Sequence, residues 1–240
     1  MSEGQLLERI DQLEHTLARV QHELERAQAV AEIKNLFARY AYYHTANLNN
    51  LIPGLFASKT PGVRVCIAEL GTWEGPQAAE RAWGVLSKWA DPNPPGMMPV
   101  HALATPFIEV AGDGLTARGM WTGVGFVAVR SPEGKPSAFW EWDKYGIDFV
   151  KEDGVWKIWH HYFTNLFRTN WVGFGEDWDP QTWEQVPLYE KWEKAFGDFP
   201  EGTRPDGPGV NQAQYSINTR QQLQPEPPEP YQRWDESKRY

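Results

Sequence analysis

A repeat of apolar residues at alternating four- and three-residue steps dominates residues 5–34. Its members are Leu6, Ile10, Leu13, Leu17, Val20, Leu24, Ala27 and Ala31. Such a repeat places one apolar stripe along a helix and is typical of a coiled-coil seam. The stripe predicts a long helix that either pairs with another copy of the chain or packs back on its own domain. Four strict heptads favour self-association, and Leu and Ile in the seam leave both dimer and trimer open.

The pattern changes after this helix, which we expect to end near residues 47–50. Pro53-Gly54 predicts a break or a short second helix at 51–57. A β-branched strand at 63–68 and a helix at 77–89 follow. Four longer strands, separated by hairpin-type turn residues, are expected at 100–110, 116–129, 139–151 and 155–164. Helices followed by an antiparallel meander predict an α+β fold.

The C-terminal part of the chain has a different composition. From residue 171 it is rich in Trp, Pro and Gly, with one possible short helix at 188–195, and residues 199–240 hold seven of the nineteen prolines. Such a segment lacks the aliphatic residues for its own core, so it either wraps another surface or stays mobile. The expected division is a coiled-coil helix at 1–30, a domain at 31–170 and an extended Pro-rich segment at 171–240.

Charge and cysteine content exclude several classes of partner and site. The formal net charge is −9, and no Lys/Arg cluster is denser than Lys238-Arg239, which argues against nucleic acid and anionic membranes. The lone Cys66 excludes an internal disulfide and a Cys-based zinc site, and we expect it to be buried and inert. The first thirty residues are charged and lack an unbroken apolar run, so we expect no signal peptide and a cytoplasmic protein.

Aromatic residues exceed what an ordinary core requires. The chain has 13 Trp, 9 Tyr and 11 Phe. Such a surplus indicates aromatic packing at subunit contacts or a pocket for flat apolar ligands.

Four segments resemble the SnoaL-like domain of the nuclear transport factor 2-like superfamily. They are AEIKNLFARYAYYH (31–44), GTWEGPQAAERAW (71–83), HALATPFIEVAGDGLTARGMW (101–121) and KYGIDFVKEDGVWKIWH (144–160). The resemblance covers about residues 31–165 and implies a cone-shaped, curved antiparallel sheet packed on helices, with a pocket between the concave face and the first helix. The family includes scytalone dehydratase, ketosteroid isomerases, polyketide cyclases and non-enzymes, so the fold alone leaves the activity open. The Trp content and the extensions at both ends also resemble bacterial diarylpropane lyases, which release formaldehyde from lignin-derived dimers without a cofactor.

The resemblance implies a set of catalytic positions. Family dehydratases carry a Tyr-Asp pair on the first helix, where this chain has Tyr43-His44, so an imidazole replaces the carboxylate. Packing along one helix face is the alternative role for these two residues and Tyr40. His101 matches the family's strand histidine, a candidate base or hydrogen-bond donor. Tyr145 matches a pocket tyrosine, whose phenol can donate to a developing oxyanion.

The third long strand offers carboxylates that would replace the missing one. Asp143 or Glu141 shares a strand face with Tyr145, whereas Trp140 and Trp142 share the other face. The alternative is that these acids pair with Arg118 or Arg130 at the sheet edge. The residues expected to hold a substrate are Tyr40, Trp121, Phe126, Trp140, Trp142 and His160.

We expect no metal or other cofactor. His160 and His161 are adjacent in a strand and point to opposite faces, so the two cannot chelate one ion. Gly119, Gly123 and Gly125 lie within a strand, where we expect them to allow the bend of the cone rather than to bind phosphate. The predicted function is a cofactor-independent lyase that acts on a lignin-derived or similar aromatic molecule. The alternatives are a dehydratase or isomerase of a steroid-like or polyketide substrate, and a non-catalytic binding protein.

Overall fold

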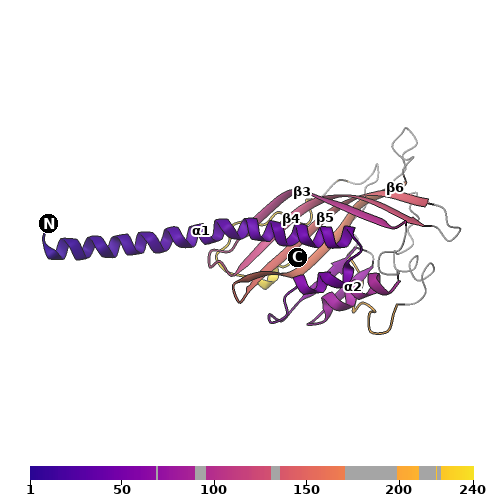
Figure 1. The fold of residues 1–240 in the computed structure, drawn as a ribbon, viewed down its shortest axis with the longest axis horizontal. Coiled ribbons are helices and arrows are strands. Elements are labelled where there is room, and N and C mark those ends of the chain that lie inside the picture. The colour runs from indigo at the N-terminus through magenta and orange to yellow at the C-terminus, as the bar shows by residue number, and fades with distance from the viewer. Residues whose placement is uncertain (69, 90–95, 131–135, 171–198, 211–219, 221–222) are drawn as a thin grey trace.

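A long helix lies across one face of a six-stranded sheet (Figure 1). This computed structural model describes residues 1–68, 70–89, 96–130, 136–170, 199–210, 220 and 223–240. The helices are α1 (Glu3–Thr45), α2 (Ala78–Trp89) and the 3₁₀ turns η1 (Asn49–Leu55) and η3 (Glu236–Lys238). The strands are β1 (Arg64–Ile67), β2 (Gly71–Glu74), β3 (Met98–Val110), β4 (Thr116–Arg130), β5 (Pro136–Glu152) and β6 (Val155–Asn170).

The predicted α+β class and the cone are confirmed. The strand order is β2-β1-β6-β5-β4-β3, and β3 to β6 form the antiparallel meander expected from the sequence. The sheet as a whole is mixed, because β1 runs parallel to β6. β6 also continues to Asn170, six residues beyond its expected end at 164, and this extension contributes to the site described below.

Helix α1 begins in a capping box, in which Ser2 and Gln5 satisfy each other's backbone N–H groups. The helix runs unbroken to Thr45, so the segment with the heptad seam and the first helix of the cone are one element. Ala29, Ile33, Phe37 and Tyr40 are buried against the sheet, whereas the N-terminal half of the helix extends beyond the sheet (Figure 1).

Aromatic rings fill the space between α1 and the concave face of the sheet, which we call the inner face. The Phe37 ring is fully buried, and its centroid lies 4.5 Å from that of Trp121 and 5.6 Å from that of Tyr145. The Phe37–Tyr145 pair packs edge to face and the Phe37–Trp121 pair is tilted, and such ring contacts add directional attraction to the burial of apolar area. The core therefore fixes how α1 lies over β4 and β5.

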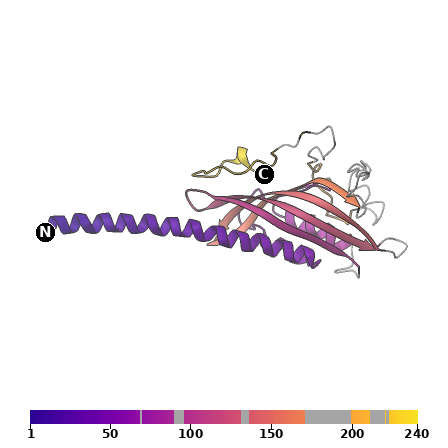
Figure 2. The same ribbon diagram turned by 90° about the horizontal axis from the view of Figure 1, so that it is seen from above.

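Residues 223–240 lie on the opposite, outer face of the sheet (Figure 2). The backbone N–H of Gly112 donates to the Tyr231 carbonyl at 2.7 Å, and the Tyr240 N–H donates to Asp148 at 2.8 Å. The Trp234 ring packs 4.7 Å from that of Trp159. This part of the C-terminal segment therefore wraps its own domain, one of the two outcomes expected. The predicted short helix at 188–195 lies outside the described residues.

Cys66 is fully buried, as predicted. Among the residues that the structure describes, no helix is both long and apolar enough to cross a membrane.

Candidate active site

A buried polar cluster lies on the inner face of the sheet and draws its side chains from β3, β5 and β6. It comprises His101 from β3, Glu141 and Asp143 from β5, and Asn165 and Arg168 from β6, each at most 9% exposed. His101 Nδ1 lies 3.3 Å from Asp143 Oδ2 and 3.4 Å from Glu141 Oε1. Arg168 Nε donates to Glu141 Oε2 at 2.8 Å, and the Asn165 amide donates to both carboxylates. The Asp143 carboxylate thus lies beside His101, and the sequence predicts both residues as catalytic.

The surroundings of the two carboxylates move their pKa values apart. Burial raises the pKa of Glu141, but the charge and hydrogen bond of Arg168 lower it by a larger amount, so the net shift is downward. Burial and the charge of Glu141 raise the pKa of Asp143 to about 7, against the opposing effect of His101. Burial lowers the pKa of His101, but the hydrogen bond to Asp143 and the two negative charges outweigh it, so the net shift is upward. The His101–Asp143 pair therefore holds a proton at neutral pH.

His44 approaches this cluster from α1. Its ring centroid lies 5.0 Å from that of His101, and its Nδ1 lies 2.9 Å from Asn49 Oδ1. With the amide oxygen as acceptor, Nδ1 carries the hydrogen and Nε2 is left as the basic nitrogen. Burial and the neighbouring charge of His101 lower the pKa of His44 to about 4, so this imidazole is neutral at pH 7. Two adjacent histidines thus have pKa values shifted in opposite directions, which separates an acid from a base.

Aromatic residues surround the two histidines. Tyr145 places its hydroxyl 3.4 Å from His101 Nδ1, and burial raises its pKa well above the usual value, so the phenol stays a neutral donor. Tyr40 packs 6.3 Å from His44 and 5.3 Å from Trp83, measured between ring centroids. The structure therefore brings Tyr40 and Tyr145 together with His44 and His101, while Tyr43 is half-buried against the core.

Two β-bulges in β6 decide which side chains reach this site. The partners Asp148↔His160 and Phe149↔Ile158 leave Trp159 as an extra residue, and the side chains of β6 change face there. His160 consequently lies on the outer face, where it contacts Asp148 at 2.9 Å and the Gly62 carbonyl at 3.1 Å. His161 takes the inner position, and burial lowers its pKa to about 3. The expectation that His160 contacts substrate is wrong, because its side chain lies on the outer face and not on the inner one.

Three aromatic residues expected at the substrate are also on the outer face. β4 and β5 pair in continuous register, with Trp121 opposite Tyr145 and Phe126 opposite Trp140. Side chains alternate along a strand, so Phe126 and Trp140 face away from Tyr145. Their rings pack on each other at 5.1 Å, and Trp142 packs on Phe167 at 6.1 Å. Of the four aromatic strand residues proposed to hold substrate rings, Trp121 alone lies on the inner face.

The sequence does not predict Asn165 and Arg168 as site residues, because they lie beyond residue 164, the predicted end of the fourth long strand. A second bulge, between the partners Trp142↔Phe167 and Asp143↔Asn165, returns Arg168 to the inner face. Glu141 therefore pairs with Arg168, not with Arg118, which lies on the outer face and contacts Asp148 at 3.3 Å. The side chain of Arg130 lies outside the described residues. A buried cation paired with Glu141 is the compensation that the burial of this carboxylate requires.

The glycines of β4 make room for the carboxylates. A Cβ at Gly125 would lie 2.4 Å from Glu141 Cγ, and one at Gly123 would lie 2.8 Å from Tyr145 Cε2. The side chains of Glu141 and Asp143 thus lie across the glycine backbone of the neighbouring strand. This close approach is a specific reason for glycine here, in addition to the bend expected from the sequence.

Gly125→Ala should displace Glu141 and lower kcat by roughly tenfold or more, because about 1 Å of misplacement in such a site costs rate. Gly54→Ala is the matched control, since a Cβ at Gly54 meets nothing within 4 Å. Steady-state kinetics and thermal unfolding of both variants check this. Equal activity of the two variants would show that the position of Glu141 does not matter to the reaction.

The cluster also contains three groups of the kind that bind metal ions. His101, Glu141 and Asp143 each offer one ligand atom, and these atoms lie within 4.8 Å of one another. The Asn165 amide and Arg168 already donate to the same two carboxylates, and a nearby guanidinium repels a cation. These donors favour occupation by protons, and the expectation of a metal-free site stays a prediction.

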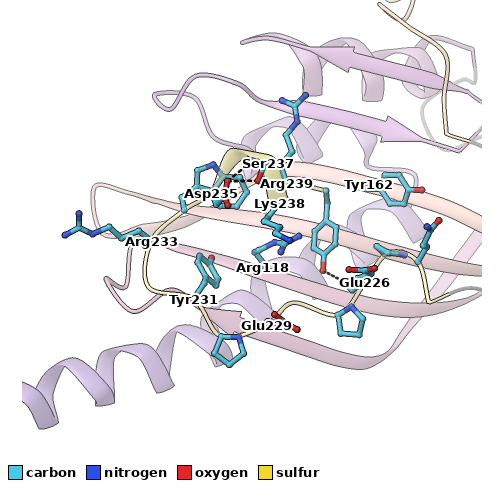
Figure 3. Close-up of a pocket in the computed structure, with 16 residues that line it drawn as sticks. Arg118, Tyr162, Glu226, Glu229, Tyr231, Arg233, Asp235, Ser237, Lys238 and Arg239 are labelled. Atoms are coloured by element: carbon cyan, nitrogen blue, oxygen red, sulfur yellow. Dashed lines mark hydrogen bonds between the residues drawn. The ribbon is translucent and has the colours of Figure 1, made fainter.

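A pocket of about 740 Å³ lies on the outer face beneath the C-terminal segment (Figure 3). Arg118 and Tyr162 line it from the sheet, and Tyr231, Trp234 and Tyr240 line it from the segment. Arg118 is paired with Asp148 and stacks 4.3 Å from the centre of the Tyr240 ring. Arg118 is thus engaged in holding the segment, and none of the residues that line this pocket flanks His101.

Comparisons with known proteins bear on the family and the fold. A family model described as a SnoaL-like domain matches residues 25–162. A search of curated proteins found no match. Among solved structures, LinA is 16% identical with a TM-score of 0.52, over 64% of this chain and 96% of that one. A type 2 hexachlorocyclohexane dehydrochlorinase (LinA) is 16% identical with a TM-score of 0.51, over 63% and 95%. A putative scytalone dehydratase from Novosphingobium aromaticivorans is 16% identical with a TM-score of 0.49, over 61% and 90%.

At these identities the solved structures establish the fold alone. The family model, in contrast, covers more than half of the chain, from the middle of α1 to the middle of β6. The protein therefore belongs to the SnoaL-like family of the nuclear transport factor 2-like superfamily.

Proposed function

We propose that this protein is a cofactor-independent lyase that acts on an aromatic small molecule by general acid/base catalysis. One observation carries the proposal: His44 and His101 lie side by side in an aromatic environment, and each is held by a different polar partner. Such a pair can supply a base and an acid to one substrate without a bound cofactor.

His101 is the proposed acid. Its Nδ1 faces Asp143, and the pair retains a proton at neutral pH, as the upward shifts of both pKa values indicate. Glu141 and Arg168 compensate each other's charge and hold the pair in place. The Tyr145 phenol, close to the same nitrogen, can donate a hydrogen bond to oxygen as negative charge develops there.

His44 is the proposed base. It is neutral because partial burial and the charge of His101 lower its pKa, and Asn49 fixes its tautomer with Nε2 unprotonated. A neutral imidazole can accept a proton from a substrate hydroxyl. The substitution of imidazole for the carboxylate expected on the first helix thus preserves a base at this position.

A diarylpropane-1,3-diol is the substrate class that suits this arrangement. His44 would take the proton from the terminal hydroxyl, and the carbon–carbon bond to that hydroxymethyl group would break to release formaldehyde. The electron pair would form the carbon–carbon double bond as the benzylic hydroxyl leaves, protonated by His101, as water. The aromatic residues near the two histidines, Trp83 among them, would contact the rings of such a substrate.

The test is to incubate the purified protein with a diarylpropane-1,3-diol and to quantify formaldehyde and the diaryl alkene. Equal amounts of the two products are expected. Loss of water without formaldehyde would identify a dehydratase instead. Binding of the diol without turnover, measured by quenching of Trp fluorescence, would favour the non-catalytic binding protein.

Activity should survive removal of metals. After exhaustive dialysis against a chelator we expect the full initial rate, because protons and Arg168 satisfy the carboxylates of the cluster. Metal content measured by mass spectrometry confirms that dialysis was complete. A rate that falls and is restored by a divalent cation would overturn the cofactor-free mechanism and point to His101, Glu141 and Asp143 as ligands.

A further inference from the structure

The apolar seam of α1 is exposed along its whole length before the sheet. Leu6, Ile10, Leu13, Leu17, Val20 and Leu24 are between 44% and 57% exposed. Six large aliphatic side chains in one stripe are costly to leave in water. In proteins most helical stability comes from packing of an apolar face, and the seam is not packed against this chain's own domain.

The seam faces away from the domain that carries it. Where α1 first meets the sheet, His22 contacts the Gly112 carbonyl at 2.6 Å and Arg26 donates to the Val110 carbonyl at 2.8 Å. Leu24, between them in sequence, is 55% exposed. Ala29 and Ile33, which are buried, continue the face of His22 and Arg26 rather than the seam. The helix therefore uses one face for its own sheet and presents the other outward.

We propose that the seam joins copies of this chain in a parallel, in-register coiled coil of two or three helices. Two observations identify a second copy as the partner. The first is the heptad spacing itself, with Leu6, Leu13 and Val20 at one core position and Ile10, Leu17 and Leu24 at the other. Knobs at this spacing fit the holes of a helix with the same spacing.

The second observation is charge complementarity beside the seam. In a parallel pair, the residue before each of Ile10, Leu17 and Leu24 is at position g. It meets the partner's residue five places further on, at position e. Arg9 then faces the partner's Glu14, an attractive pair, and Thr16 and Glu23 face the partner's Gln21 and Gln28. An antiparallel pair centred between Leu6 and Leu24 also brings Arg9 against Glu23 of the partner subunit, but it places Glu14 against Glu14 of the partner subunit. The parallel arrangement therefore contains attraction and no like-charge contact.

The test compares two double variants of the full chain by analytical ultracentrifugation. The wild type is expected to be a dimer or trimer at micromolar concentration. Leu13→Glu/Leu17→Glu places charges in the seam and should raise the dissociation constant by roughly 100-fold or more. His15→Glu/Ala18→Glu adds the same charges on the side of the helix away from the seam and should leave association unchanged. A monomeric wild type, or a seam variant that associates as tightly as the wild type, overturns the proposal.

Orientation is tested by cross-linking. Under mild oxidation, Leu6→Cys should form an intermolecular disulfide, because parallel helices bring the two copies of position 6 together. Glu8→Cys, on the outer face, should not. The native Cys66 is buried and does not compete. Association through the seam without cross-linking at position 6 would refute the parallel arrangement.

Discussion

Replacing His101 with Gln is expected to lower kcat on the diarylpropane-1,3-diol by about a hundredfold or more, the usual contribution of a general acid. Gln keeps a polar side chain of similar size beside Asp143, so the buried cluster should still assemble. It cannot deliver a proton to a leaving hydroxyl at neutral pH. Steady-state kinetics measures the loss, and circular dichroism with thermal unfolding shows whether the fold is kept.

His15→Gln is the matched control for this substitution. His15 lies on the exposed part of α1, 82% exposed, and its side chain contacts Asp11 of the same helix. Its replacement should leave kcat unchanged. If His44→Gln and His101→Gln both turn over at the wild-type rate, histidine catalysis is wrong, and Asp143 and Glu141 become the leading candidates. If those are also dispensable, the non-catalytic binding protein is the better description.

The pH profile of kcat separates the two histidine roles. The acid is active while the His101–Asp143 pair keeps its proton, so activity should fall as pH rises through the pKa of that pair, whose Asp143 member lies at about 7. The base must be neutral, so activity should also fall as pH drops towards the pKa of His44, about 4. His44→Gln should remove the acidic limb and leave the alkaline limb in place.

The fold could be predicted from the sequence because its signals are local. Heptad spacing gave α1, and alternation between glycine-containing turns gave the four long strands. Both patterns report on a few neighbouring residues, and the structure reproduces them with shifts of a few residues at the ends. The parallel pairing of β1 with β6 joins residues almost a hundred positions apart, and no local pattern encodes it.

The site could be predicted only in part, because its composition depends on strand phase. Alternation from Tyr145 correctly groups Asp143 and Glu141, and the same alternation excludes Trp140 and Trp142. In β6, bulges at Trp159 and near Leu166 reset the phase, so that His161 and Arg168 face inwards and His160 outwards. A bulge inserts one residue without a distinctive sequence signature. Only the register of β5 against β6 therefore shows which side chains of β6 face inwards.

Replacing Arg168 with Met should cost about 3–5 kcal/mol of unfolding free energy at pH 8, the usual penalty for breaking a buried ion pair. Arg168 donates to Glu141 at 2.8 Å, and both side chains are buried. Met fills a similar volume but leaves Glu141 as a buried carboxylate without its cation. Urea unfolding, followed by fluorescence, measures the change. Arg19→Met is the control, because the exposed Arg19–Glu23 pair should contribute less than about 1 kcal/mol.

The pH dependence of this loss identifies its cause. Arg168 holds the pKa of Glu141 below its usual value, so the pair stabilises the fold at pH values above the unfolded pKa, and the benefit is lost as pH falls through the folded pKa. Without Arg168 the pKa of Glu141 rises, and protonation relieves the buried charge. The deficit of Arg168→Met should therefore be smaller at pH 5 than at pH 8. Glu141→Gln in the same chain should recover stability and remove the difference between the two pH values. A deficit that is equal at both pH values would assign the loss to packing rather than to the uncompensated carboxylate.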